Sequence, residues 1–258
     1  MLEKEFLDYV KQQDITCGPG WYGLVLWILE VLKYHNENNP EIQYKIIRIE
    51  EKMGELHIEI PEKFPGFVKK MINMANVSSK TICKYCGCIG ELQQYDGGYK
   101  TLCSECKKKY KRKKEPIVAN VANDVLDYMS KQSTIHCEYG WYGLIMSVVV
   151  AAVEYNVKNP DNPYKPLFEE KDGKLSIEPD APPESLKEII HRAQDASGKI
   201  CDRCGCRGKL QEGMKEGPRT LCRECGKMKY DEIKTMAIRR HRLKAAERGY
   251  IIWNNGDN

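Results

Sequence analysis

The sequence predicts an α+β protein made of two tandem, pseudo-symmetric repeats, each with helices, a β-hairpin and a module that contains two CxxC pairs. Three observations carry this prediction. "CGPGWYGL" at 17–24 returns as "CEYGWYGL" at 137–144, and "EEKMGELHIE" at 50–59 returns as "EEKDGKLSIE" at 169–178. "ICKYCGCIGEL" at 82–92 returns as "ICDRCGCRGKL" at 200–210, and "TLCSEC" at 101–106 returns as "TLCREC" at 220–225. Because the offset stays at 118 to 120 residues, we interpret the chain as a duplication.

A length of 258 residues suits two modest domains. The predicted boundary falls near Glu115 and Pro116, which gives repeat 1 at 1–115 and repeat 2 at 116–258. Each repeat is expected to open on an amphipathic helix, marked by Phe6, Leu7 and Val10 in one copy and by Val118, Val121, Val125 and Leu126 in the other.

The elements that follow can be taken in order. A glycine loop leads to a largely buried helix over about 21–38, which Asn39 and Pro40 stop. Apolar residues at 46, 47 and 49, and at 56, 58 and 60, flank a Met-Gly turn and predict a β-hairpin. A further helix, "PGFVKKMINMANVSS" or "PPESLKEIIHRAQDAS", continues to the first CxxC pair of each repeat.

The CxxC pairs predict two structural zinc ions. Two residues between cysteines let both thiolates face one tetrahedral ion, and Gly87 or Gly205 after the first pair frees the backbone to turn. A short hairpin and a lysine-rich helix around the pairs favour a treble-clef or ribbon-like module over 83–106 and again over 201–225. The predicted ligands are Cys83, Cys86, Cys103 and Cys106 in one module, and Cys201, Cys204, Cys222 and Cys225 in the other.

Four of the twelve cysteines remain outside these sets: Cys17, Cys88, Cys137 and Cys206. We expect them to be buried small residues, with a redox or additional metal role as the alternative. Disulfides are disfavoured because a cytosolic chain keeps its thiols reduced.

"GWYGL", "EEKMGELHI", "MANVSSKTICKYCGCIG" and "TLCSEC" together resemble a family of uncharacterised proteins from tailed bacteriophages and prophages. The resemblance covers nearly all of each repeat. Met53 and Asp172 stand where that family usually has an aromatic residue, and Cys106 and Cys225 stand where a zinc-binding histidine is common. The resemblance implies a phage origin and the cytoplasm of an infected bacterium, but no established activity.

Composition and motifs argue against several classes of protein. The N-terminus lacks a basic region followed by an apolar run, and "LVLWIL" and "LIMSVVVAAV" are shorter than a bilayer span, so no membrane contact is expected. The five histidines lie outside the repeated pattern, and Walker, GxSxG and HExxH motifs are absent. We therefore expect a binding protein without catalytic residues.

Basic character is local. Residues 107–114, "KKKYKRKK", carry seven cationic side chains, and residues 234–248 have a net charge of +5, so the remainder of this +4 chain is at −8. Polyanion contact is predicted for Lys107, Lys108, Lys109, Lys111, Arg112, Arg239, Arg240 and Arg242. A solvated helix end and a protein-docking patch are the alternatives for "KKKYKRKK".

The first functional hypothesis is capture of an anionic nucleotide-type ligand, such as a nucleotide immune signal, to counter host anti-phage defence. Aromatic rings at two helix N-termini and lysines beside the hairpin turns would form the site, near the seam between the repeats. Its residues are Trp21, Tyr22, Lys52, Trp141, Tyr142 and Lys171. The alternative for each Trp is a place in the core of its own repeat.

Two other hypotheses stay open. A DNA- or RNA-binding zinc protein would act through segments 107–114 and 234–248. A protein inhibitor would bind a host enzyme. The sequence also leaves a homo-oligomer open.

Overall fold

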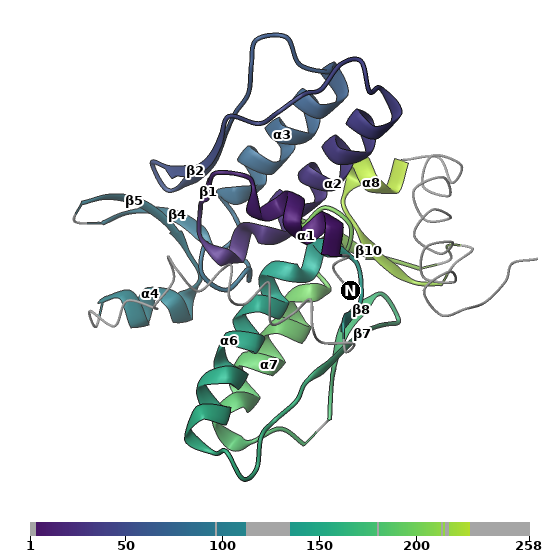
Figure 1. Ribbon diagram of the computed structural model, residues 1–258. Coiled ribbons are helices and arrows are strands. Elements are labelled where there is room, and N and C mark those ends of the chain that lie inside the picture. The colour runs from purple at the N-terminus through teal and green to yellow at the C-terminus, as the bar shows by residue number, and fades with distance from the viewer. Residues whose placement is uncertain are drawn as a thin grey trace, which may run out of the picture. The chain divides into compact units, whose positions relative to one another are not determined.

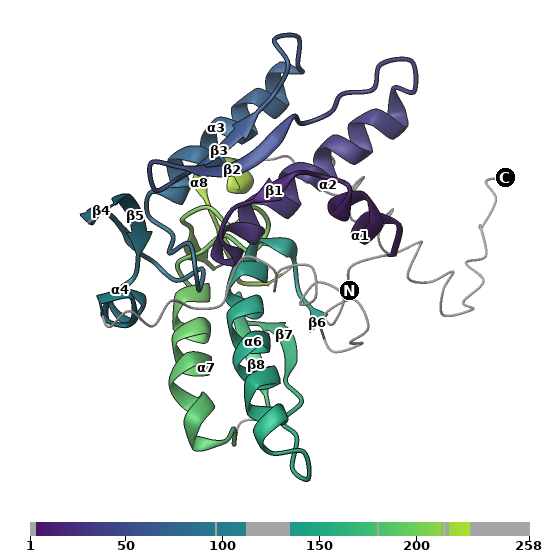
Figure 2. The same ribbon diagram turned by 60° about the vertical axis from the view of Figure 1, so that its left-hand side comes forward.

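The computed structural model describes residues 4–95, 97–111, 135–179, 181–212, 214 and 217–227. The first part of the chain forms α1 (Lys4–Lys11), β1 (Ile15–Thr16), the 3-10 helix η1 (Pro19–Trp21), α2 (Tyr22–Asn38), β2 (Arg48–Lys52), β3 (Glu55–Glu59), α3 (Gly66–Ser79), β4 (Glu91–Tyr95), β5 (Gly98–Leu102) and α4 (Ser104–Lys111). Figure 1 places α2 beside α3, and Figure 2 shows the same pair from another side. The predicted helices and hairpins of this part are confirmed.

The second part forms β6 (Ile135–His136), the 3-10 helix η2 (Tyr139–Trp141), α6 (Tyr142–Lys158), β7 (Leu167–Lys171), β8 (Lys174–Glu178), α7 (Glu184–Ser197), β9 (Lys209–Gln211), β10 (Arg219–Leu221) and α8 (Arg223–Lys227). The chain up to Cys222 forms one compact unit, and α8 belongs to a second. The predicted boundary and the expected helix with Val118, Val121, Val125 and Leu126 lie outside the described residues.

Helices α2 and α6 supply a large share of the core because nearly all their first-half side chains are apolar and buried. Near the end of each helix, an asparagine side chain forms two hydrogen bonds with the backbone of the loop that follows. In the first part, the Asn36 amide accepts from the Tyr44 N–H at 3.0 Å and donates to the Tyr44 carbonyl at 2.7 Å. Asn156 makes the same two hydrogen bonds with the backbone of Tyr164.

The segment Tyr139–Lys158, which includes α6, is long and apolar enough to cross a membrane. The sequence prediction counted only uninterrupted apolar stretches, so it missed this wider window. More than half of the window is buried within the protein, as expected for a core helix.

The β2–β3 and β7–β8 hairpins have the predicted two-residue turns. Strands β2 and β3 pair antiparallel, and Met53 and Gly54 between them have φ angles of 54° and 77°. Two positive φ values define the turn that matches the strand twist, and a glycine adopts such a value without strain. The sequence did not reveal β1, a two-residue strand that pairs parallel with β2 and makes a three-stranded sheet; β6 does the same with β7.

The repeated "GWYG" phrase lies at a close contact between the two parts of the large unit. A Cβ atom added to Gly23 would lie 2.3 Å from the carbonyl oxygen of Gly140, and one added to Gly143 would lie 2.3 Å from that of Gly20. Glycine permits this close approach because it has no Cβ. The sequence led us to expect a ligand groove at this seam, but backbone lies against backbone at these four positions.

Candidate metal centres

Two groups of four buried cysteines can each hold a metal ion. Within each group the sulfur atoms all lie within 4.8 Å of one another, and the pairs Cys86–Cys103 and Cys204–Cys222 have sulfurs 3.5 and 3.6 Å apart. A tetrahedral ion with metal–sulfur distances of about 2.3 Å would place its sulfurs about 3.8 Å apart. These groups are Cys83, Cys86, Cys103 and Cys106, and Cys201, Cys204, Cys222 and Cys225, as the spacing predicted.

The first CxxC of each group is a tight knuckle. The Gly87 N–H donates to the Cys83 carbonyl at 3.0 Å, and the Cys83 N–H donates to the Cys88 carbonyl at 2.8 Å. Gly87 has a φ of +72°, and Gly205 has +71° in the equivalent knuckle. These turns aim the cysteine thiols to one side, so the local backbone shapes half of each metal site.

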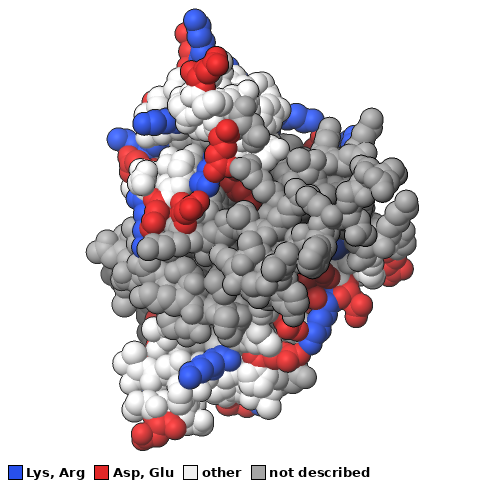
Figure 3. Space-filling view, turned by 45° about the vertical axis from the view of Figure 1, so that its right-hand side comes forward, with Lys and Arg blue, Asp and Glu red and all other residues white. Residues whose placement is uncertain are grey.

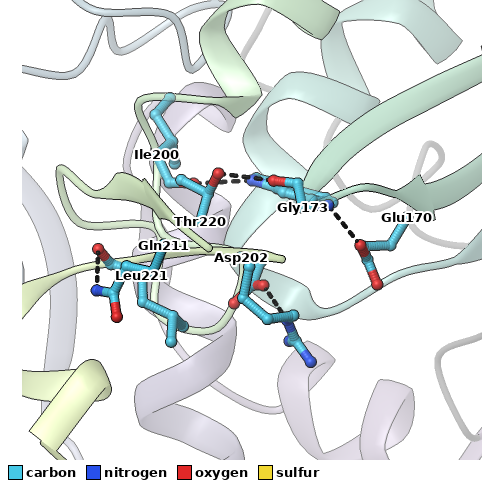
Figure 4. Close-up of polar contacts among 9 residues, drawn as sticks. Glu170, Gly173, Ile200, Asp202, Gln211, Thr220 and Leu221 are labelled. Carbon is cyan, nitrogen blue, oxygen red and sulfur yellow. Dashed lines mark hydrogen bonds and ion pairs between the residues drawn. The ribbon is translucent and has the colours of Figure 1, made fainter. Parts of the chain in front are cut away.

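A hydrogen bond ties each metal module to the tip of the preceding hairpin. The Thr101 hydroxyl donates to the Gly54 carbonyl at 2.8 Å, and the Thr220 hydroxyl donates to the Gly173 carbonyl at 2.6 Å. Figure 4 shows the second of these contacts, together with the Glu170 carboxylate that accepts from the Gly173 N–H at 2.8 Å. The recurring threonine therefore links two β-hairpins within each part.

A buried charge pair follows the first ligand of each group, and its polarity is reversed between the two. Lys84 pairs with Glu51, while Asp202 accepts from Arg219 at 2.5 Å (Figure 4). Burial raises the pKa of the Asp202 carboxyl, whereas the Arg219 charge opposes that shift. Sequence reasoning missed both pairs, because residues 33 and 17 positions apart gave no local pattern.

The repeated tryptophans lie in the core. Trp21 and Trp141 are fully buried, and their indole N–H groups donate to the carbonyls of Ile82 and Ile200 at 2.8 and 2.9 Å. These contacts confirm the core alternative, since each ring fixes the backbone just before a metal knuckle. Tyr22 and Tyr142 are buried as well, so none of the four rings presents an open face for stacking.

The predicted lysines of the nucleotide site lie on the hairpins. Lys52 and Lys171 are both exposed, at the ends of β2 and β7. Lys171 pairs with Glu178 and lies 3.5 Å from Glu169, so its charge is already offset within its own hairpin.

Of the four remaining cysteines, Cys88 and Cys206 are buried as expected. The Cys88 thiol contacts the Arg192 carbonyl at 3.9 Å, and the Cys206 thiol contacts the Met74 carbonyl at 3.9 Å. Each knuckle therefore packs against the helix of the other part. Cys17 and Cys137 are half-buried, and burial raises the pKa of Cys17 to about 12, which keeps this thiol protonated.

The first metal module carries an ordered basic and aromatic surface on α4 and its hairpin. The Lys107 ammonium donates to the Gln93 side chain at 2.5 Å, and Tyr110 packs edge-on against Tyr95 with ring centroids 5.2 Å apart. The Lys100 ammonium lies 5.3 Å from the Tyr110 ring centroid. Of the predicted polyanion contacts, the Lys111 side chain, Arg112, Arg239, Arg240 and Arg242 lie outside the described residues.

Lysine and arginine side chains also occur elsewhere on the described surface, mixed with acidic ones (Figure 3). On the face that Figure 3 shows, positive and negative side chains are interspersed over the described surface. Lys108 on α4 is exposed and pairs with Glu105, and Lys109 is exposed beside it.

No known protein family, curated protein or solved structure matches this chain. The resemblance to the phage family therefore stays a prediction. The two cysteine groups and the surface around α4 are the features of the described residues that bear on function.

Proposed function

We propose that the protein is a non-catalytic, zinc-stabilised nucleic-acid-binding protein made of two copies of one unit. The observation that carries the binding function is the set of lysines that the first metal module holds on α4 and its hairpin. The proposal comprises three parts: the metal, the duplication and the binding surface.

Zinc is the metal that suits these sites. Four buried cysteines whose sulfurs lie within 4.8 Å of one another favour zinc, with iron as the competitor for the same ligands. A four-thiolate site is closed, so it has no position for substrate or activated water. The two ions would therefore have structural roles.

The duplication is supported by the reciprocity of contacts. Gly23 approaches Gly140 as Gly143 approaches Gly20, and Gly87 approaches Gly143 as Gly205 approaches Gly23. Pairs of contacts that exchange residues in this way are typical of a two-fold interface. We infer that two similar units pack about an approximate two-fold axis at the "GWYG" phrase.

Neighbouring side chains constrain two of these lysines, Lys107 and Lys100, in positions that suit phosphate. Gln93 orients Lys107, Tyr110 lies beneath Lys100, and Lys108 and Lys109 extend from the next positions of α4. Cationic side chains that neutralise phosphates give affinity that depends on salt and little on sequence. Aromatic side chains interleaved with them can stack on bases.

Binding is assigned to the first module because the second differs at the equivalent positions. Gly226 follows Cys225 where Lys107 follows Cys106. Arg219, the counterpart of Lys100, is committed to Asp202. The second module therefore lacks two of the cations that the first presents.

The proposal predicts salt-dependent binding of single- and double-stranded DNA or RNA. Replacement of Lys107, Lys108 and Lys109 by Gln should lower affinity at least about tenfold near 50 mM salt. It should reduce the slope of log affinity against log salt by about 2 for single strands and about 3 for duplexes. Fluorescence anisotropy with labelled oligonucleotides would measure both quantities.

A charge-matched control replaces Lys63, Lys69 and Lys70 by Gln, because these exposed lysines lie on or beside α3. This variant should keep the wild-type slope. Equal losses in the two variants, or no binding of any nucleic acid at low salt, would contradict the assignment.

The other two hypotheses stay predictions. Capture of a nucleotide immune signal loses its stacking platform, since all four proposed rings are buried. Cyclic oligonucleotides as competitors in the same titration would test it. Inhibition of a host enzyme and a place in the cytoplasm of an infected bacterium rest on the phage resemblance alone.

A further inference from the structure

A side chain from the second part of the chain reaches the cysteine group of the first. The Arg192 guanidinium, on α7, donates to the Cys103 sulfur at 3.1 Å and lies 3.7 Å from the Cys86 sulfur. These partners are 89 and 106 residues away in sequence. The backbone of the same residue accepts from the Cys88 thiol, so α7 contacts the first knuckle in two ways.

A methionine occupies the equivalent position in the first part of the chain. Met74 on α3 is the counterpart of Arg192, because its carbonyl accepts from the Cys206 thiol as the Arg192 carbonyl accepts from Cys88. A thioether has no N–H group and carries no charge. The two cysteine groups therefore match in their ligands, but the residue at this equivalent position of the opposite helix differs.

We propose that Arg192 is a positioning residue for the first metal centre, which makes that centre less reactive toward thiol-directed electrophiles than its own ligands would be alone. This inference rests on the zinc part of the proposed function. Four thiolates and one divalent ion carry a net charge of −2, which a guanidinium offsets in part. Hydrogen bonds to sulfur withdraw electron density from it and fix its orientation, as partners of metal ligands do elsewhere.

The same contact links the first centre to the seam. Arg192 reaches the sulfurs only while α7 packs against the first knuckle, beside the glycines of the "GWYG" phrase. Displacement of α7 would therefore remove the Arg192 guanidinium from the Cys86 and Cys103 sulfurs and would expose these sulfurs at the same time. The first centre therefore depends on the second part of the chain.

The test is site-resolved alkylation of the full-length, metal-loaded chain by N-ethylmaleimide. Each event adds one sulfur across the maleimide C=C bond and takes one proton from water, and peptide mass spectrometry counts it at each cysteine. Arg192→Met should speed alkylation of Cys86 and Cys103 about tenfold, in line with the effect of other ligand partners. The rates at Cys204 and Cys222 should stay unchanged.

Two further variants separate charge from general loosening. Arg192→Lys keeps the charge without the planar fork and should give an intermediate rate at Cys86 and Cys103. Met74→Arg places a guanidinium at the equivalent position of α3 and should slow alkylation of Cys204 and Cys222. An unchanged ratio between the two groups in Arg192→Met, or an equal rise at all eight ligands, would overturn the proposal.

Native mass spectrometry before labelling keeps this inference separate from the proposed function. Absence of metal from the wild-type chain would refute the zinc proposal itself. Two bound ions with indistinguishable alkylation in every variant would refute only the role of Arg192. Should Arg192→Met fail to fold, the Arg192→Lys and Met74→Arg rates decide the outcome.

Discussion

Gly23→Ala is expected to destabilise the protein by about 3 kcal/mol or more. The new methyl carbon would lie 2.3 Å from the Gly140 carbonyl oxygen and 3.0 Å from its carbon, and both atoms belong to backbone that cannot rotate away. In a chain of this size that loss corresponds to a fall in melting temperature of about 6 to 12 °C. Differential scanning calorimetry would measure it.

The expected loss of stability is opposite in sign to the usual effect of a Gly→Ala substitution in a helix. Alanine usually stabilises a helix by about 1 kcal/mol relative to glycine. Gly66→Ala, at the first residue of α3, is the matched control because a Cβ there would meet nothing within 4 Å. Its melting temperature should stay level or rise, and the same result for Gly23→Ala would refute the backbone contact at the seam.

Removal of metal is expected to unfold both modules. Structural zinc sites contribute of the order of 10 kcal/mol, which is comparable to the total stability of a domain. The loss should spread beyond the modules, because Trp21 and Trp141 are hydrogen-bonded to the residues just before the knuckles. A chelator titration followed by circular dichroism and hydrogen exchange would measure the extent of unfolding.

Single substitutions separate a metal ligand from a spectator thiol. Cys83→Ser should release one ion per chain and lower the melting temperature strongly. Cys17→Ser is the control, because Cys17 is half-buried and lies outside both groups. Its effect should stay within about 1 kcal/mol. Two ions retained by Cys83→Ser would contradict the ligand assignment.

Local patterns predicted the elements of this fold well. Helix α2, the Met53-Gly54 hairpin and the two groups of cysteines depend on periodicity, turn residues and ligand spacing, all of which lie within short stretches of chain. The two-residue strands β1 and β6 escaped prediction because pairing with a distant strand defines them, and two residues have no period.

Contacts between distant segments could not be predicted in the same way. The sequence showed that Gly20 and Gly23 recur as Gly140 and Gly143. It could not show that these glycines pack against one another at the seam, because that contact depends on the folded structure. The same holds for Arg192, whose guanidinium meets sulfurs from another part of the chain. A signal was available nonetheless: Cys88 and Cys206 recur beside a full set of ligands, which indicates a packing role there.

The metal content of the purified protein tests the central claim most directly, since both modules and the α4 surface depend on it. Elemental analysis with native mass spectrometry should find two zinc ions per chain, and cobalt exchanged into both sites should give the absorption of tetrahedral four-thiolate coordination. A folded chain that carries no metal, or that holds iron in place of zinc, would contradict the account.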